Sequence, residues 1–129
     1  MSMTILFLVG RVLFGGYFIM NGFNHFRKMG MMKGYASSKG VPMAGLAVAV
    51  TGVMILLGGL GILLGVYIQL SLLLLAIFLI FVTLKMHNFW AVTDPNMKMM
   101  ETVNFYKNMA LLGAVLMLLF IPSPWVYSV

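Results

Sequence analysis

Long apolar runs alternate with short polar segments along the chain. The runs cover about residues 3–26, 42–64, 66–84 and 103–121. Each has roughly the 17–25 residues that an α-helix needs to cross a hydrocarbon core. They do not alternate apolar and polar residues as barrel strands do, and backbone groups in lipid must be satisfied within the segment. The pattern predicts an all-α integral membrane protein, a single domain over residues 1–129 with an antiparallel bundle of four transmembrane helices.

Composition excludes a soluble protein and several kinds of site. Of the 129 residues, 63% are hydrophobic and 8% are charged, whereas a soluble domain has about 45–50% apolar and about 25% charged residues. Cysteine is absent, which excludes disulfides, thiolate-bound metals and iron–sulfur clusters within this chain. No basic residue precedes the first run and no small-x-small cleavage site follows it, so we expect a retained span rather than a signal peptide.

The polar connections differ in length and charge. The turn LLGVY is short and uncharged, and predicts a tight hairpin of the second and third helices. The two long connections, residues 27–41 and 85–102, lie on one side of a four-span protein. That side holds seven of the eight basic residues, namely Arg27, Lys28, Lys33, Lys39, Lys85, Lys98 and Lys107. Because basic residues in short loops stay cytoplasmic, we expect these loops inside a cell membrane and both termini outside.

Local signals refine this topology. Asp94 as a cap and Pro95 as the first helical residue predict a short amphipathic lead-in over residues 95–102. Trp125 and Tyr127 are typical of an aromatic anchor at the outer interface. The net charge of +6 fits a bilayer with anionic headgroups. Without a recognition motif it does not indicate a nucleic-acid partner.

Small residues indicate where the helices pack. Glycines at positions 45, 52 and 59 repeat at a seven-residue spacing, which positions 15 and 22 repeat in the first run. In lipid, small residues let helix backbones approach closely, so the spacing favours a left-handed bundle. A second small patch, Ala110, Gly113 and Ala114, lies in the fourth run. The third run has few small residues, and we expect it to face lipid or a partner.

Several polar residues fall within the predicted spans. Arg11 either snorkels to lipid phosphates or contacts an anion or a quinone carbonyl. Asn21 and His25 share one helical face near the basic end. A stripe of Glu101, Asn104, Lys107 and Asn108 approaches the same end, as does KMHNFW with His87 and Trp90. Polar residues at membrane depth face the bundle interior, so these side chains form either one binding pocket or a structural network.

Methionines cluster in both long connections, in KMGMMK (residues 28–33) and in MKMM (residues 97–100). Thioether sulfur and the imidazoles of His25 and His87 are ligands that Cu(I) accepts. The alternative is that these methionines are flexible apolar side chains at the membrane surface. The sequence contains no complete metal motif and no nucleophile–base arrangement, so we expect no metal site and no catalytic residues.

Five motifs carry a family resemblance. GRVLFGGYFIMNGFNHF, GYASSKGVP, GGLGILLGVY, MHNFWAVTDP and NFYKNMALLGA follow one another between about Gly10 and Leu119. This order resembles the DoxX family of small four-span membrane proteins, and its archaeal-type members in particular. The family pattern falls on Arg11, Gly22, Gly40, Pro42, Gly59, Gly65, His87, Phe89, Trp90, Asn104, Lys107 and Asn108. Many members carry a glutamate in the second span, where this chain reads TGVMILLGG without an acid.

The resemblance implies association with membrane redox systems, because the family takes its name from a quinone-linked sulfur-oxidation and terminal-oxidase system. We therefore expect an accessory subunit that packs with other membrane subunits of a quinone-linked complex, with a homo-oligomer as a further arrangement. The candidate quinone-binding residues are Arg11, Asn21, His25, His87, Trp90, Asn104, Lys107 and Asn108. The alternatives are a small quinone-linked oxidoreductase subunit with its own pocket, a Cu(I)-handling protein and a transporter.

Overall fold

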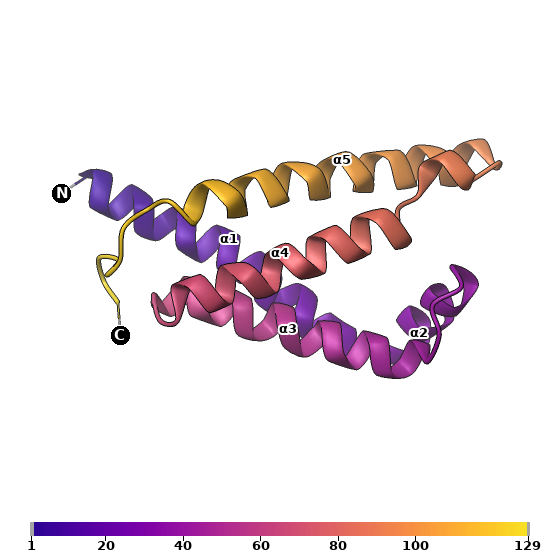
Figure 1. The fold of residues 1–129 in the computed structure, drawn as a ribbon, viewed down its shortest axis with the longest axis horizontal. Coiled ribbons are helices and arrows are strands. Elements are labelled where there is room, and N and C mark those ends of the chain that lie inside the picture. The colour runs from indigo at the N-terminus through magenta and orange to yellow at the C-terminus, as the bar shows by residue number, and fades with distance from the viewer. Residues whose placement is uncertain (1, 129) are drawn as a thin grey trace.

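The computed structural model describes residues 2–128 and is helical throughout, without strands in that range (Figure 1). The elements are α1 (Ser2–Arg27), α2 (Met29–Ser38), α3 (Ala44–Leu64), α4 (Ile68–Lys85), the short 3₁₀ turn η1 (Phe89–Ala91) and α5 (Pro95–Leu118). Three stretches are long and apolar enough to cross a membrane: Thr4–Arg27, Ala44–Leu64 and Ile68–Ala91. The prediction of an all-α protein with membrane-spanning helices is confirmed, and the fourth span stays a prediction.

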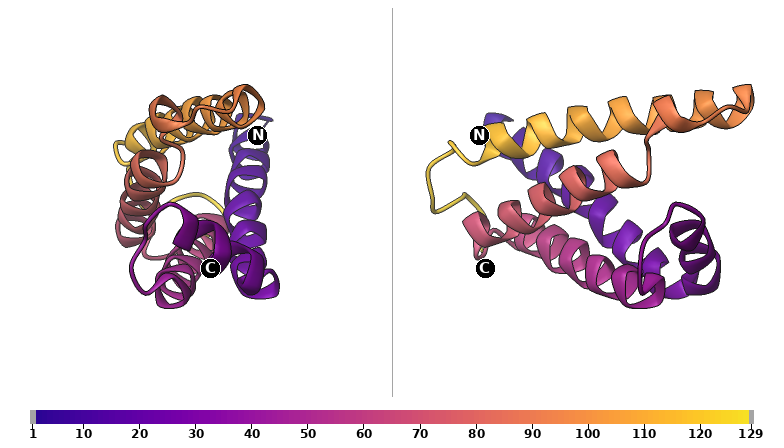
Figure 2. Two further views of the ribbon diagram at one scale, coloured as in Figure 1. Left: turned by 90° about the vertical axis from the view of Figure 1, so that its right-hand side faces the viewer. Right: turned by 45° about the vertical axis from the view of Figure 1, so that its right-hand side comes forward.

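The four long helices surround a common interior in chain order. α1 packs along α3, α3 along α4 and α4 along α5, while α2 covers the end of α3 (Figure 2). Within residues 2–128, the backbones of α1 and α5 do not approach each other closely. The outer faces carry exposed apolar side chains, for example Leu6, Leu13, Met20 and Phe120. An apolar perimeter of this extent belongs in a bilayer rather than in water.

Glycines bring α1 and α3 into close contact. A Cβ atom placed on Gly59 would lie 2.7 Å from the carbonyl oxygen of Gly15, and one on Gly22 would lie 3.0 Å from that of Gly52. These four glycines therefore bring two backbones into contact, as their spacing predicts. Gly113 in α5 differs, because nothing among the described residues lies within 4 Å of its Cβ position.

The hairpin between α3 and α4 turns at Gly65, as predicted. This residue adopts a φ of 72°, which disfavours residues with a side chain. Its N–H donates to the carbonyl oxygen of Gly61 at 2.8 Å, and the N–H of Val66 donates to the same oxygen at 3.0 Å. These bonds end α3 in the left-handed turn that commonly closes helices.

The third span was expected to face lipid or a partner, and one face of α4 does so. This face carries the exposed side chains Leu70, Leu73, Ile77, Ile80 and Leu84. The opposite face of α4 packs between α3 and α5. It buries Ile68, Ser71, Leu72, Leu75, Ala76, Phe78, Leu79 and Thr83. Small residues are used here too, because Gly58 and Gly61 of α3 lie directly against Leu75 and Ser71 of α4. The same cluster contains Phe18, Ile55 and Val115 from three other helices.

The sequence did not predict α2, which occupies most of the connection taken for a loop. Met, Lys and Ala favour a helix, and Gly40 with a φ of 78° ends it. The N–H of Val41 donates to Ala36 and that of Gly40 to Ser37, which is a Schellman termination. Ala36 and Val41 pack with Ala44, Val48 and Met86. A second small core therefore fixes α2 against α3 and the end of α4.

At the other end, the chain after α5 folds back over the bundle. α5 ends at Leu118, three residues before the predicted end of the last apolar run. Trp125 is 3% exposed and packs edge-on against Phe7 with ring centroids 5.2 Å apart. The prediction of an interfacial anchor was therefore wrong for Trp125, whose ring completes the core. Tyr127 is exposed.

Candidate functional site

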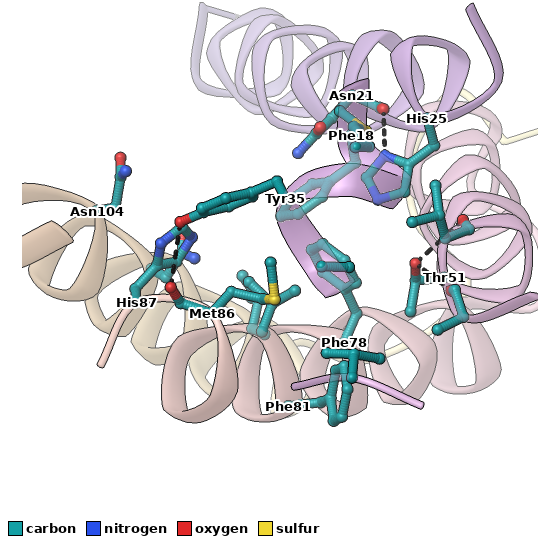
Figure 3. A pocket seen from close by; sticks show the side chains of 18 of the residues that line it. Phe18, Asn21, His25, Tyr35, Thr51, Phe78, Phe81, Met86, His87 and Asn104 are labelled. Atoms are coloured by element: carbon teal, nitrogen blue, oxygen red, sulfur yellow. Dashed lines mark hydrogen bonds between the residues drawn. The ribbon is translucent and has the colours of Figure 1, made fainter. Parts of the chain in front are cut away.

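A cavity of about 280 Å³ lies between the helices near the end that α2 covers (Figure 3). Side chains of all five α-helices and of the segments next to them line it. Its walls are largely apolar and aromatic, with Phe18, Phe78, Leu79, Phe81 and Val82 among the lining residues. Figure 3 shows His25 and Thr51 on one side and His87 and Asn104 on the other, with Tyr35 reaching between them. The polar groups are thus distributed around an apolar space.

The structure brings together six of the eight candidate residues. Those that line the cavity are Asn21, His25, His87, Asn104, Lys107 and Asn108. They come from α1, from the segment after α4 and from α5, so residues far apart in sequence meet. Arg11 and Trp90 do not line this cavity. That the cavity binds a cofactor stays a prediction.

On the α1 side, His25 is held by its own helix. Its Nδ1 lies 2.8 Å from the backbone carbonyl oxygen of Asn21, one turn earlier. The ring stands edge-on to Phe78 at a centroid distance of 5.9 Å, and the residue is 8% exposed. The close approach of Gly52 leaves room for this residue, because a Cβ there would lie 2.8 Å from the Cβ of His25. The tight α1–α3 contact therefore sets where the imidazole sits.

At the basic end, a buried carboxylate joins three segments. Glu101 of α5 is 4% exposed. Its Oε2 lies 2.9 Å from Lys39 Nζ and accepts a hydrogen bond from the Tyr35 hydroxyl. Its Oε1 accepts a bond of 3.0 Å from His87 Nδ1 and one of 3.5 Å from Asn104 Nδ2. The Glu101 cluster, defined as Glu101, Tyr35, Lys39, His87 and Asn104, thus ties α2 and the end of α4 to α5.

The cluster keeps its carboxylate ionised. Burial by itself would raise the pKa of Glu101, but hydrogen bonds from Tyr35, Lys39 and His87 outweigh it and lower the pKa from 4.5 to about 2. The pKa of the Tyr35 hydroxyl is raised, chiefly by burial and further by its hydrogen bond to Glu101 and the negative charge there. At neutral pH, Tyr35 is therefore a hydrogen-bond donor and Glu101 an acceptor.

On the α5 side, the polar stripe divides between the rim and the interior. Lys107 is exposed, and its Nζ donates to the Tyr17 hydroxyl of α1 at 3.1 Å. Asn108 is 4% exposed, and its side-chain amide forms no hydrogen bond with other residues in the 2–128 range. Asn108 lines the cavity, where a bound molecule or water can complete the hydrogen bonding of its amide.

The prediction that Arg11 snorkels was wrong. Arg11 is 2% exposed and lies at the end of the molecule opposite α2. Its guanidinium donates to the carbonyl oxygens of Ile62 at 3.1 Å, Leu63 at 2.9 Å and Tyr127 at 3.4 Å, and also to that of Val126. The last carbonyls of a helix lack partners within it and carry partial negative charge. Arg11 therefore caps α3 and holds the C-terminal segment.

Trp90 belongs to an exposed aromatic group rather than to the cavity wall. It lies in η1 and is 55% exposed. Its ring stands edge-on to Phe89 and Phe105 at centroid distances of 5.3 and 5.7 Å. Tyr106 adjoins the same group. Amphipathic rings gathered at the end of membrane helices are typical of the interface with water.

Sequence reasoning missed Tyr35 and Lys39 and did not include Glu101 among the binding residues. The two α2 residues stand in a stretch that reads as a loop, so no periodic pattern pointed to the interior. The Asn104–Lys107–Asn108 spacing did include Glu101 in one stripe, and that signal was sufficient to find it. Of the clustered methionines, Met32 lines the cavity, as does Met86, whereas Met97, Met99 and Met100 are exposed on the first turns of α5.

Comparison with known proteins identifies the family. The family model described as DoxX matches residues 6–88, which include most of α1, all of α2, α3 and α4, and the polar turn with His87. Searches of curated proteins and of solved structures found no match. The matched segment is more than half of the chain and contains the α1, α2, α3 and α4 walls of the cavity. The chain belongs to the DoxX family.

Proposed function

We propose that this protein is a four-span subunit of a membrane redox complex and that its cavity binds the head group of a membrane quinone. In this proposal the chain supplies a binding pocket, and electron transfer requires partner subunits. The observation that carries it is the cavity, where buried polar side chains face an apolar, aromatic space inside a membrane protein. Binding sites for small organic ligands have this composition, with apolar walls and few polar groups that fix orientation.

Size and chemistry both suit a quinone ring. A volume of about 280 Å³ accommodates one substituted ring, while an isoprenoid tail would extend into the bilayer. Phe18, Phe78 and Phe81 offer aromatic surface for the ring. The Asn108 amide offers a donor and an acceptor to its oxygen atoms. The residues present therefore fit a quinone head group.

Partners are proposed because the chain lacks redox groups and α5 is poorly covered. Without cysteine, it cannot hold an iron–sulfur cluster through thiolates. α5 buries three residues, Glu101, Asn108 and Val115, and it leaves Ala110 and Gly113 exposed. Small residues on an exposed membrane helix let another helix approach closely. Affinity purification in mild detergent should retain other subunits, and a solitary homo-oligomer would contradict this part of the proposal.

We propose that the fourth span covers residues 103–121, of which α5 includes residues 103–118. α5 runs beside α4 (Figure 1). The first turns of α5, residues 95–102, belong at the basic surface, which we place in the cytoplasm. Because the chain has no cysteine, single cysteines report topology directly. We expect Tyr127→Cys to react with an impermeant maleimide on intact cells, and Ser37→Cys and Thr93→Cys to react only after permeabilisation. Equal labelling of all three on intact cells would contradict four spans.

Quinone binding is tested with the purified protein in detergent. Duroquinone, a tetramethyl ring without a tail, should bind stoichiometrically by isothermal titration calorimetry. Asn108→Leu should weaken binding about tenfold, because it removes a hydrogen-bonding group from the cavity and leaves an apolar side chain of similar size. Thr51→Val is the matched control, because the Thr51 hydroxyl already donates to the Ala47 carbonyl oxygen at 2.8 Å. Saturable binding that is unchanged in Asn108→Leu would place the ligand elsewhere.

A further inference from the structure

We infer that the cavity selects the reduced, hydroquinone form of its ligand, and that His25 determines this selectivity. The inference rests on the proposed function and deepens it from a ring-binding cavity to one that recognises hydroxyl groups. It follows from the hydrogen bonding of the His25 imidazole.

The tautomer of His25 is set by its backbone contact. A carbonyl oxygen only accepts hydrogen bonds, so the 2.8 Å contact with Asn21 requires the proton to be on Nδ1. A neutral imidazole carries one N–H, and Nε2 then has a lone pair and no hydrogen. No carboxylate lines the cavity to balance an imidazolium charge, and an unpaired buried charge is costly. The neutral form with Nε2 as an acceptor is therefore the state that this environment favours.

The acceptor faces the cavity. Figure 3 shows the His25 ring pointing into the space between α1, α2 and α4. Nε2 forms no hydrogen bond with any residue in the part of the chain that the structure describes. The aromatic edge of Phe78, 5.9 Å away between centroids, provides no strong donor. A ligand that satisfies this atom must bring its own hydrogen-bond donor.

A hydroquinone brings that donor and a quinone does not. Each ring hydroxyl of a hydroquinone can donate to Nε2, whereas a quinone carbonyl would place its lone pairs against that of the nitrogen. A site built to bond a hydroxyl rejects the analogue without it more strongly than an apolar pocket can. Asn108 does not discriminate, because its amide donates as well as accepts. Lys107 favours a carbonyl, but it is exposed and donates to Tyr17.

Binding of matched ligands tests the selectivity. Duroquinol, duroquinone and the dimethyl ether of duroquinol share one ring and differ in whether they offer hydroxyl donors. Under anaerobic conditions in detergent, we expect the wild-type protein to bind duroquinol about tenfold more tightly than either of the others. His25→Phe should lower the affinity for duroquinol to that for duroquinone and leave the latter unchanged. Tyr106→Phe, at an exposed residue outside the cavity, should keep the selectivity.

The outcomes separate this inference from the proposed function. Equal affinities for duroquinol and duroquinone would overturn the selectivity and leave ring binding intact, whereas failure of both ligands to bind would overturn both. If His25→Phe does not fold, a measurement on the wild-type protein still tests the inference. Its ¹⁵N spectra should show a protonated Nδ1 and an unprotonated Nε2 at His25, with the Nε2 resonance shifted by duroquinol and not by its dimethyl ether. A protonated Nε2 in the free protein would contradict the inference.

Discussion

Arg11 and His25 are both buried on α1, but the protein satisfies them to different degrees. Arg11 donates to four carbonyl oxygens at the end of α3 and in the C-terminal segment. His25 uses one ring nitrogen for its own helix and turns the other toward the cavity. Complete pairing indicates a residue that holds the fold together. Partial pairing in a cavity is what the proposed ligand-binding role of His25 requires. Burial alone therefore does not distinguish these two residues, whereas their hydrogen bonds and their position relative to the cavity do.

Replacing Arg11 should give the largest effect. Arg11→Leu leaves buried carbonyls without donors, and we expect the free energy of unfolding to fall by about 3 kcal/mol. Unfolding in detergent by heat or by SDS titration measures this, with the exposed Arg27→Gln as the control. His25→Phe should cost less than about 1 kcal/mol in the same assay. If Arg11→Leu kept its stability and lost duroquinone binding, the comparison would be reversed.

The sequence predicted α1, α3, α4 and the start of α5 because hydrophobic runs, Gly65 and the Asp94–Pro95 cap are local signals. The convergence of Asn21, His25 and the α5 stripe could also be predicted, because helical periodicity and a common membrane side restrict where those residues lie. The role of Arg11 could not be predicted, because its partners are backbone carbonyls more than fifty residues away. Every residue has a backbone carbonyl, so the sequence does not indicate which of them Arg11 contacts.

The same reason explains why the sequence did not predict α2. Tyr35 and Lys39 reach Glu101 only because a second small core fixes α2 against α3, and that packing is a tertiary effect. α4 has one face toward the bundle and one exposed face. A uniformly apolar helix shows no face, so its pattern does not say which side is lipid and which is protein.

The Glu101 cluster resembles Arg11 in its complete pairing but lies at the cavity end, and its charge makes it sensitive to pH. Glu101→Gln should lower the free energy of unfolding by about 2 kcal/mol at pH 7, because Lys39 and His87 lose a charged acceptor. Asp94→Asn removes the other carboxylate of the chain and keeps a good helix cap, so it is the matched control. A similar loss in both variants would show that general charge, and not this cluster, is responsible.

The pH dependence has a defined sign. The pKa of Glu101 in the folded protein, about 2, lies below its ordinary value of 4.5. Its stabilisation is therefore fully present above about pH 4.5 and is lost as the pH falls toward 2. Thermal unfolding measured between pH 6 and pH 2.5 should show that the difference in stability between the wild-type protein and Glu101→Gln decreases as the pH falls. A constant difference between the two proteins over that range would contradict the assignment.

The smallest effect on stability is expected where α1 and α5 face each other. Tyr17→Phe removes the hydroxyl that accepts from Lys107 at 3.1 Å, and an exposed contact of this kind contributes about 0.5 kcal/mol or less. Because the two helix backbones do not pack against each other, loss of this bond should ease passage of a ligand between them. Stopped-flow quenching of intrinsic fluorescence by duroquinone should show association and dissociation rising together, by about twofold, at unchanged affinity. Tyr106→Phe, also on the exposed surface, should change neither rate. Unchanged rates in Tyr17→Phe would mean that the ligand reaches His25 by another route. The space between the α1 and α5 backbones would then be available to a helix of a partner subunit.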